Sequence, residues 1–224
     1  FILNYVYGLE ERNFKANMPQ WELMLKFFLL YAVPYYLTCL FYAIFQKDWS
    51  MFFKQQFWFR SGFLLVLLSV SGGAYFYRDW LTQILDRQVL YFAHKLSFNI
   101  GNTVFVLIPI LIFYLIFDKK KQYGFGLYGL SRNNFYPKPY FVLLLAMVPL
   151  IIWASFQPDF LYTYPTYKFR GHSEAWLNLP YWATTAIYEV VYLADFVSVE
   201  LAFRGFLILG LAKVMGRATL MPMV

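Results

Sequence analysis

The chain has 224 residues, and its composition excludes most classes of soluble protein. Hydrophobic residues make up 61% and charged residues 14% of it, against about 45–50% and about 25% in ordinary soluble domains. With 26 Phe and 20 Tyr, a soluble globule of this length could not bury its apolar side chains. The composition therefore predicts an integral membrane protein and excludes a soluble enzyme, a disordered chain and a secreted disulfide scaffold.

The formal net charge of +7 fits basic residues that flank membrane spans and contact lipid headgroups. We therefore expect membrane lipids as partners and no nucleic acid. The single cysteine, Cys39, lies in an apolar run, which leaves no intrachain disulfide and no thiolate zinc site. Because the chain begins with Phe1 and ends at Val224 inside an apolar run, we expect it to be part of a longer product.

In chain order, apolar runs between basic residues predict an all-α, polytopic bundle of transmembrane helices that forms a single membrane domain. Pro34 falls inside the first run, where neighbouring helices can satisfy the carbonyl that it leaves free. In the second run, the small residues from Ser69 to Gly73 favour close helix contact. About six spans are predicted, at 27–46, 61–77, 97–117, 140–156 and 182–211, with a sixth over 212–224 that continues further.

The connectors differ in character. In residues 79–96, apolar residues recur at helical spacing opposite charged ones. This pattern predicts an amphipathic helix that lies at the membrane interface. Residues 118–139 form a basic, glycine-rich connector, and residues 157–180 form a long loop rich in Tyr and Pro.

Four charged residues fall inside the fifth predicted span: Glu189, Asp195, Glu200 and Arg204. Each costs about 2.5–3.5 kcal/mol on insertion scales, so such residues are expected to be functional or paired. At about 100° per residue, Glu200 and Arg204 share one side of a helix, Glu189 lies about 20° from Glu200, and Asp195 points about 140° away toward a different neighbour. Two interpretations stay open, namely a polar active-site stripe and a neutralised ion pair whose arginine reaches toward the interface.

A family resemblance appears at the same residues. The segment from Ser198 to Leu207, SVELAFRGFL, resembles the first motif of the CPBP family of CAAX-protease and bacteriocin-processing membrane proteins, a motif written Glu-Glu-x-x-x-Arg. Glu200 corresponds to its second glutamate and Arg204 to its arginine. The segment GLYGLSR, which ends at Arg132, is similar to the connector that precedes the family's core, so the resemblance covers about 124–224.

The resemblance implies an intramembrane endopeptidase acting on a peptide or membrane-protein substrate. Glu200 and Arg204 would be the catalytic residues: Glu200 would orient or activate water, and Arg204 would hold its carboxylate. Glu189 and Asp195 would line a polar cavity at membrane depth. A transporter or channel is less favoured, because the first four predicted spans contain no acidic residue.

Two features depart from the family pattern. Its first glutamate is replaced by Val199, and its two histidine motifs do not occur in this sequence. His94 and His172 share no helical face and cannot form the set of about three ligands that metal hydrolysis needs, so we expect no metal ligand here. A cofactor such as zinc would require histidines beyond Val224. The alternative is a catalytically inactive member that serves as a binding or assembly subunit. Its Tyr- and Trp-rich loops and single cysteine suit the bacterial inner membrane, our expected location, but equally other membranes.

Overall fold

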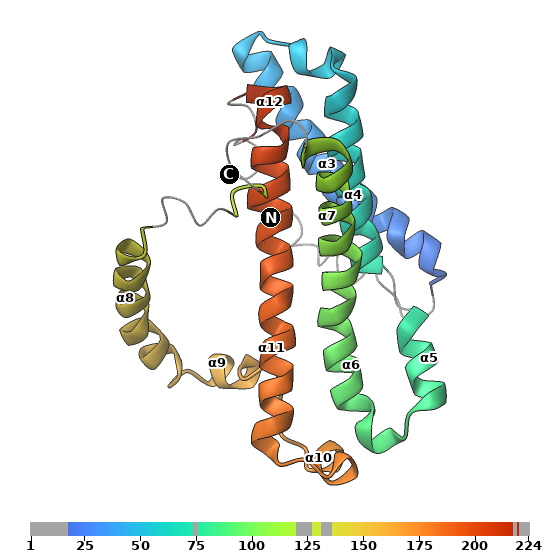
Figure 1. Ribbon diagram of the computed structural model, residues 1–224, viewed down its shortest axis with the longest axis vertical. Coiled ribbons are helices and arrows are strands. Elements are labelled where there is room, and N and C mark those ends of the chain that lie inside the picture. Colours follow the sequence, from blue (N-terminus) through green and yellow to red (C-terminus); the bar gives the residue numbers. More distant parts are fainter. Residues whose placement is uncertain (1–17, 74–75, 120–126, 131–135, 217–218, 220–224) are drawn as a thin grey trace.

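The computed structural model describes residues 18–73, 76–119, 127–130, 136–216 and 219. Within these ranges every regular element is a helix (Figure 1), apart from one isolated bridge between Leu127 and Leu130. The prediction of an all-α chain is confirmed. The basic connector predicted at 118–139 and the sixth span predicted at 212–224 lie largely outside the described residues.

The helices follow one another in four groups along the chain. The first group is α3 (Gln20–Gln46), the 3₁₀ turn η1 (Ser50–Phe53), α4 (Gln55–Gly73) and α5 (Phe76–Ile84). A second, unbroken group is α6 (Arg87–Asn102), the π-helical η2 (Thr103–Leu107), α7 (Ile108–Phe113) and the π-helical η3 (Tyr114–Asp118). Three separate helices follow, α8 (Lys138–Ala154), α9 (Pro158–Thr163) and α10 (His172–Leu177). The last group is α11 (Tyr181–Glu200), the π-helical η5 (Leu201–Gly210) and α12 (Leu211–Met215).

Three helical stretches are long and apolar enough to cross a membrane. They are Gln20–Gln46, which is α3, Gln55–Ile84, which contains α4 and α5, and Arg87–Asp118, which runs from α6 to η3. Their lengths meet the roughly 20 residues that a spanning helix needs. The fourth predicted span corresponds to the shorter apolar helix α8. The fifth corresponds to the continuous helix that runs from α11 through η5 into α12, which is long but carries the four charged residues noted above.

The amphipathic helix predicted at 79–96 is divided differently in the structure. It separates into α5 and the start of α6, with Asp86 in extended conformation just before α6 (φ −62°, ψ 146°). The second part continues directly into the helix that ends at Asp118. Its apolar face, which includes the buried Val89 and Phe92, packs against α10 and α11. Tertiary packing therefore buries a face that periodicity alone could not distinguish from a lipid-facing one.

Close contact between α3 and α4 depends on small residues, as the sequence indicates. A Cβ added at Gly73 would come within 2.7 Å of the Met24 side chain and 2.9 Å of its backbone. A Cβ at Gly72 would lie 3.0 Å from the ring of Phe27. This contact brings α3 and α4 into the main core, which they share with α7, η5 and α12.

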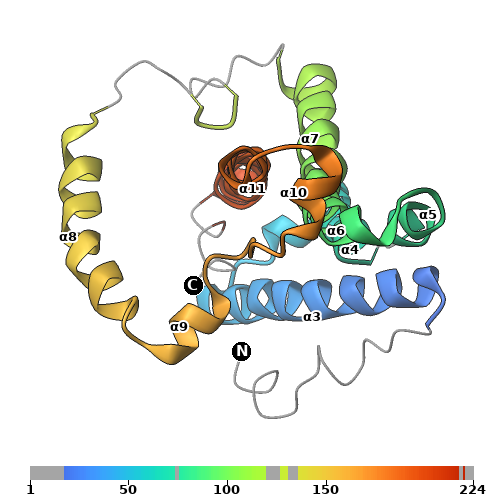
Figure 2. The ribbon, with the colours of Figure 1, turned by 90° about the horizontal axis from the view of Figure 1, so that it is seen from below.

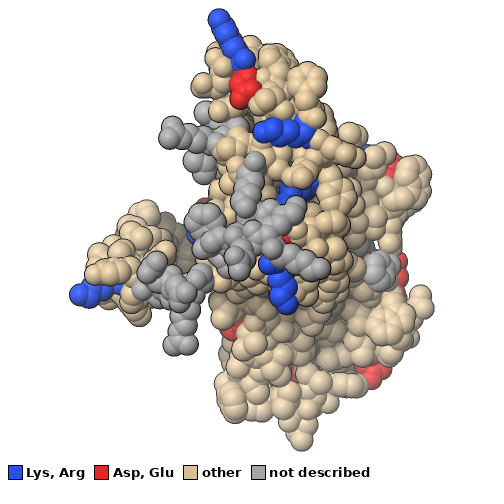
Figure 3. Space-filling view, turned by 45° about the horizontal axis from the view of Figure 1, so that its top comes forward, with Lys and Arg blue, Asp and Glu red and all other residues tan. Residues whose placement is uncertain are grey.

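Helix α8 stands apart from the other helices in two perpendicular views (Figures 1 and 2). None of its residues is buried, although it is strongly apolar from Phe141 to Trp153. On the face that Figure 3 shows, uncharged side chains cover most of the described surface, and charged ones stand singly or in small groups. An apolar exterior of this kind suits a lipid environment better than water.

Candidate functional site

Glu200 and Arg204 lie together, as their spacing predicts. Glu200 is the last residue of α11, Arg204 lies in η5, and the Arg204 Nη1 to Glu200 Oε2 distance is 3.0 Å. The two side chains are 51% and 77% exposed, with Arg204 the more open. Both line a cavity of about 480 Å³ whose walls include Tyr140, Phe196 and Leu209. The pair is thus a surface ion pair open to an apolar cavity, and by itself it contributes about 0–1 kcal/mol to stability.

The opposite wall of this cavity comes from the short segment around Tyr128. A Cβ at Gly205 would lie 3.0 Å from the Cβ of Tyr128, and one at Gly210 would lie 3.3 Å from its ring. The two glycines of η5 therefore let this segment approach the helix closely. Gly129 turns the chain there with φ 89°, a conformation that glycine adopts without strain.

Asp195 lies on another side of α11, as the helical angle predicts. Its Oδ2 accepts a long 3.4 Å hydrogen bond from Asn102 Nδ2, and Ser71 Oγ donates to Asn102 Oδ1 at 2.7 Å. The second oxygen of Asp195, Oδ1, is buried and has no hydrogen-bond partner in the described structure. Glu189 is exposed and is not among the residues that line the cavities described here. The structure thus joins Glu200 to Arg204 and separates both from Asp195 and Glu189.

Val199, the residue just before Glu200, faces a different cavity from Glu200. Val199 and Asp195 both line a cavity of about 310 Å³ between α11, α6, α4 and α3. Because the two residues are four apart, the carboxylate of Asp195 lies on the same helix face one turn before the valine. Asp195 therefore supplies the carboxylate that lines the same cavity as Val199.

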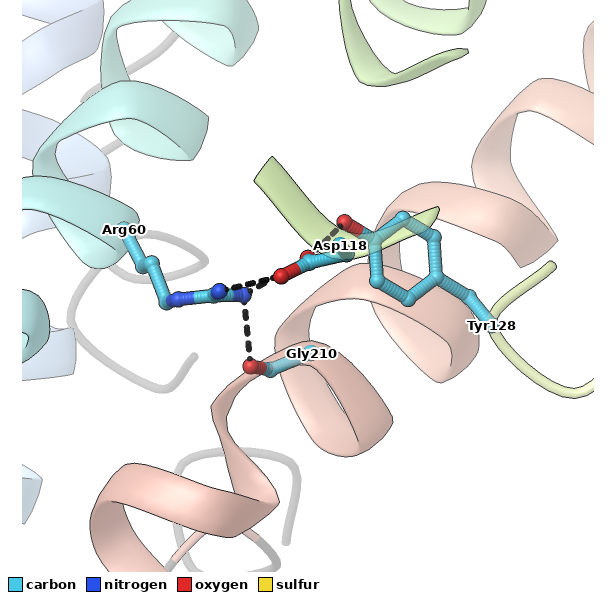
Figure 4. A network of polar contacts seen from close by, with 4 residues as sticks. All are labelled: Arg60, Asp118, Tyr128 and Gly210. Carbon is cyan, nitrogen blue, oxygen red and sulfur yellow. Dashed lines mark hydrogen bonds and ion pairs between the residues drawn. The ribbon is translucent and has the colours of Figure 1, made fainter. Parts of the chain in front are cut away.

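Sequence reasoning missed a second polar site, formed by Arg60 and Asp118 (Figure 4). Arg60 Nη2 lies 2.5 Å from Asp118 Oδ1, and Nη1 donates at 2.9 Å both to Asp118 Oδ2 and to the Gly210 carbonyl. The Tyr128 hydroxyl donates to Asp118 Oδ2 at 2.6 Å. Arg60 and Asp118 are 4% and 1% exposed. The network joins α4, η3 and η5 to the segment that walls the Glu200 cavity.

Arg60 directly precedes the second predicted span and Asp118 directly follows the third, so both fall just outside the predicted spans. The structure buries both residues, and Asp118 is the last residue of the continuous helix that begins at Arg87. One signal could have revealed the pair: the start of the second span and the end of the third lie on the same side of a membrane when helices alternate in direction. Opposite charges at those two ends can therefore meet.

The described residues offer no metal centre. His94 lies in α6 and His172 is the first residue of α10. Within the described ranges, no group of three or more His, Cys, Asp and Glu side chains is placed to hold one metal ion. The described residues therefore do not fit a zinc site.

Comparisons of the chain with protein-family models, with curated proteins and with solved structures found no match.

Proposed function

We propose that this protein is a polytopic membrane endopeptidase of the CPBP type, acting in the bacterial inner membrane, with Glu200 as its proton-accepting carboxylate. The observation that carries the proposal is the Glu200–Arg204 pair, 3.0 Å apart, which faces a cavity of about 480 Å³ on a largely apolar helix. An ionisable pair in such a helix is costly to insert and marks a functional site by default.

The chemistry needs a base beside the peptide bond. A carboxylate at Glu200 takes a proton from water as the water oxygen attacks the carbonyl carbon, and the proton then passes to the leaving nitrogen as the C–N bond breaks. Arg204 is always charged, so its guanidinium keeps the carboxylate of Glu200 oriented. The walls of Phe196, Tyr140 and Leu209 suit an apolar peptide segment.

A second candidate function is non-catalytic binding, and two observations favour it. Val199 cannot accept a proton, and the described residues hold no metal-ligand set. In that case the exposed Glu200–Arg204 pair would contact charged or polar groups of a partner helix. Its replacement would then weaken an assembly without changing any cleavage.

The test is Glu200→Gln in the full-length protein reconstituted into liposomes. The probes are two fluorescence-quenched peptides, one a prenylated CAAX peptide and the other an apolar helix long enough to span the bilayer. We expect the wild type to cleave at least one probe and Glu200→Gln to lose about 100-fold or more in rate. Glu189→Gln, exposed on the same helix and outside the cavity, is the matched control and should cleave as the wild type does.

Two results would overturn the proposal: cleavage that Glu200→Gln retains, or no cleavage of either probe by the wild type. If the wild type cleaves neither probe and Glu200→Gln also releases a protein that co-purifies with it, the binding function is supported instead.

A further inference from the structure

A third cavity, larger than the two described above, lies between α5, α6, α11 and the loop before α10 and is not lined by Glu200. Its volume is about 580 Å³, and its lining is mixed in charge and polarity. Two cationic residues, Arg78 of α5 and Lys95 of α6, line it together with the acidic Asp195 of α11. In the described structure Lys95 and Asp195 share this cavity without forming an ion pair.

Three residues of this cavity carry buried polar atoms that have no hydrogen-bond partner in the described structure. These atoms are His94 Nδ1, Asn99 Nδ2 and Asp195 Oδ1. The Asn99 side chain is the most enclosed, since the residue is only 3% exposed. A buried polar group without a partner is unfavourable, so three of them around one cavity point to a ligand that pairs with them.

The cavity has an apolar extension. Asp195 and Phe98 also line the neighbouring 310 Å³ cavity, whose other walls are mostly apolar and include Phe27, Leu68 and Val106. A polar space and an apolar space that share two wall residues fit one amphiphilic molecule, with its head in the first and the start of its chain in the second.

The surrounding surface suits the level of lipid headgroups. Exposed tryptophans occur on all three elements near this end of the molecule: Trp80 on α5, Trp176 on α10 and Trp182 in the first turn of α11. In Figure 1, α10 and the start of α11 lie at the lower end of the long axis, and α5 lies in the lower half of the molecule. Tryptophan is enriched where a membrane protein crosses from hydrocarbon to water.

We propose that this cavity binds the headgroup of an aminophospholipid. The phosphate lies beside Lys95 and Arg78, whose cations match it in charge. The primary amine donates to Asp195, whose only described hydrogen bond is the long one from Asn102. Asn99 Nδ2 donates to a phosphate or glycerol oxygen, and an acyl chain passes Phe98 into the apolar cavity. This inference does not depend on the role of Glu200.

The experiment measures lipid binding to the purified full-length protein by native mass spectrometry, with phosphatidylethanolamine as the probe. Phosphatidylglycerol and phosphatidylcholine serve as comparison lipids, and glycerophosphoethanolamine as the soluble headgroup. We expect phosphatidylethanolamine to bind about tenfold more tightly than either comparison lipid, because only its primary amine can pair with Asp195. The soluble headgroup should bind much more weakly, since it lacks the chain.

Lys95→Met should weaken binding of phosphatidylethanolamine about tenfold, whereas Arg87→Met, an exposed cation on the same helix, should leave it unchanged. Asp195→Asn should remove the preference for phosphatidylethanolamine over phosphatidylglycerol, while Glu189→Gln keeps it. Lys95 is only half-buried, so its variant tests the site even if Asp195→Asn fails to fold. Equal binding of the three lipids, equal affinity of the soluble headgroup, or unchanged binding by Lys95→Met would each overturn the proposal.

Discussion

At the scale of single residues, the strongest polar interaction in the described structure is the buried pair of Arg60 and Asp118. Two charges removed from water are costly to bury, and their attraction offsets that cost only when geometry and further hydrogen bonds are good. Here Tyr128 and the Gly210 carbonyl supply those hydrogen bonds. The pair therefore fixes how α4, η3 and η5 meet.

Asp118→Asn should destabilise the protein by about 3–5 kcal/mol, because it leaves the Arg60 cation buried without its counter-charge. The double variant Arg60→Met with Asp118→Leu should recover much of that loss. Unfolding of the purified protein in mixed micelles, followed by tryptophan fluorescence, measures both. Lys26→Met, which breaks the half-exposed pair with Glu22, is the control and should cost about 0–1 kcal/mol. A loss from Asp118→Asn as small as that of the control would contradict the prediction.

A second buried cluster joins Glu174 of α10 to Tyr167 and Thr184. The Tyr167 hydroxyl donates to Glu174 Oε1 at 2.6 Å, and Thr184 Oγ1 donates to the same oxygen at 3.2 Å. Burial alone raises the pKa of Glu174, but these hydrogen bonds outweigh it and lower the pKa below its ordinary value. Burial and the hydrogen bond to Glu174 raise the pKa of Tyr167 to about 12.

These two shifts act at opposite ends of the pH scale. The lowered pKa of Glu174 stabilises the fold above the ordinary value of 4.5, and this contribution is lost as pH falls through the folded pKa. The raised pKa of Tyr167 stabilises the fold below pH 10, and that contribution is lost as pH rises toward about 12. Tyr167→Phe should therefore flatten both limbs of the stability profile and lower stability at pH 7. Unfolding measured from pH 3 to pH 12 tests this, and a variant profile parallel to the wild type would contradict it.

At the scale of helices, the contact between α3 and α4 is limited by how closely their backbones approach. A Cβ added at Gly73 would lie 2.9 Å from the backbone of Met24. That backbone cannot move aside as the end of a flexible side chain could. Gly62 lies on the same helix, and a Cβ added there would have no neighbour within 4 Å. The two glycines therefore form a matched pair of test sites.

Gly73→Ala should destabilise the protein by about 1–3 kcal/mol through overpacking. Gly62→Ala should be neutral or stabilise it by up to about 1 kcal/mol, since alanine is the better helix former. Both are measured by the same unfolding experiment. Equal effects of the two substitutions would show that the helices do not approach as closely as the structure places them.

At the scale of the whole molecule, we predict that the exposed apolar helix α8 lies in the hydrocarbon of a membrane. Spin labels at positions 145 and 151, introduced in a Cys39→Ala background, should collide readily with oxygen and rarely with a water-soluble nickel complex. The reason is that oxygen concentrates in hydrocarbon, whereas the polar complex stays in water. A label at the exposed Gln83 of α5 is the comparison site and should show the reverse. Nickel accessibility on α8 equal to that of Gln83 would exclude membrane burial of this helix.

The sequence alone determined that the described residues form an all-α structure, together with much of its local order. Apolar runs predicted the C-terminal end of α3 at Gln46, the small-residue contact near Gly73 and the pairing of Glu200 with Arg204. Each of these depends on neighbours within a few helical turns or on bulk hydropathy, which a single sequence contains. The direction of Asp195, away from Glu200, follows from the same helical periodicity.

Only the tertiary structure decided which helices meet and which polar groups they enclose. Arg60 and Asp118 lie 58 positions apart, so their pairing depends on how α4 packs against the end of η3. The cavity lined by Lys95, Asn99 and Asp195 likewise exists only because α6 continues as one helix and packs on α11. Local periodicity gives the face on which a side chain lies, whereas packing alone determines whether that face meets lipid, water or an opposite charge.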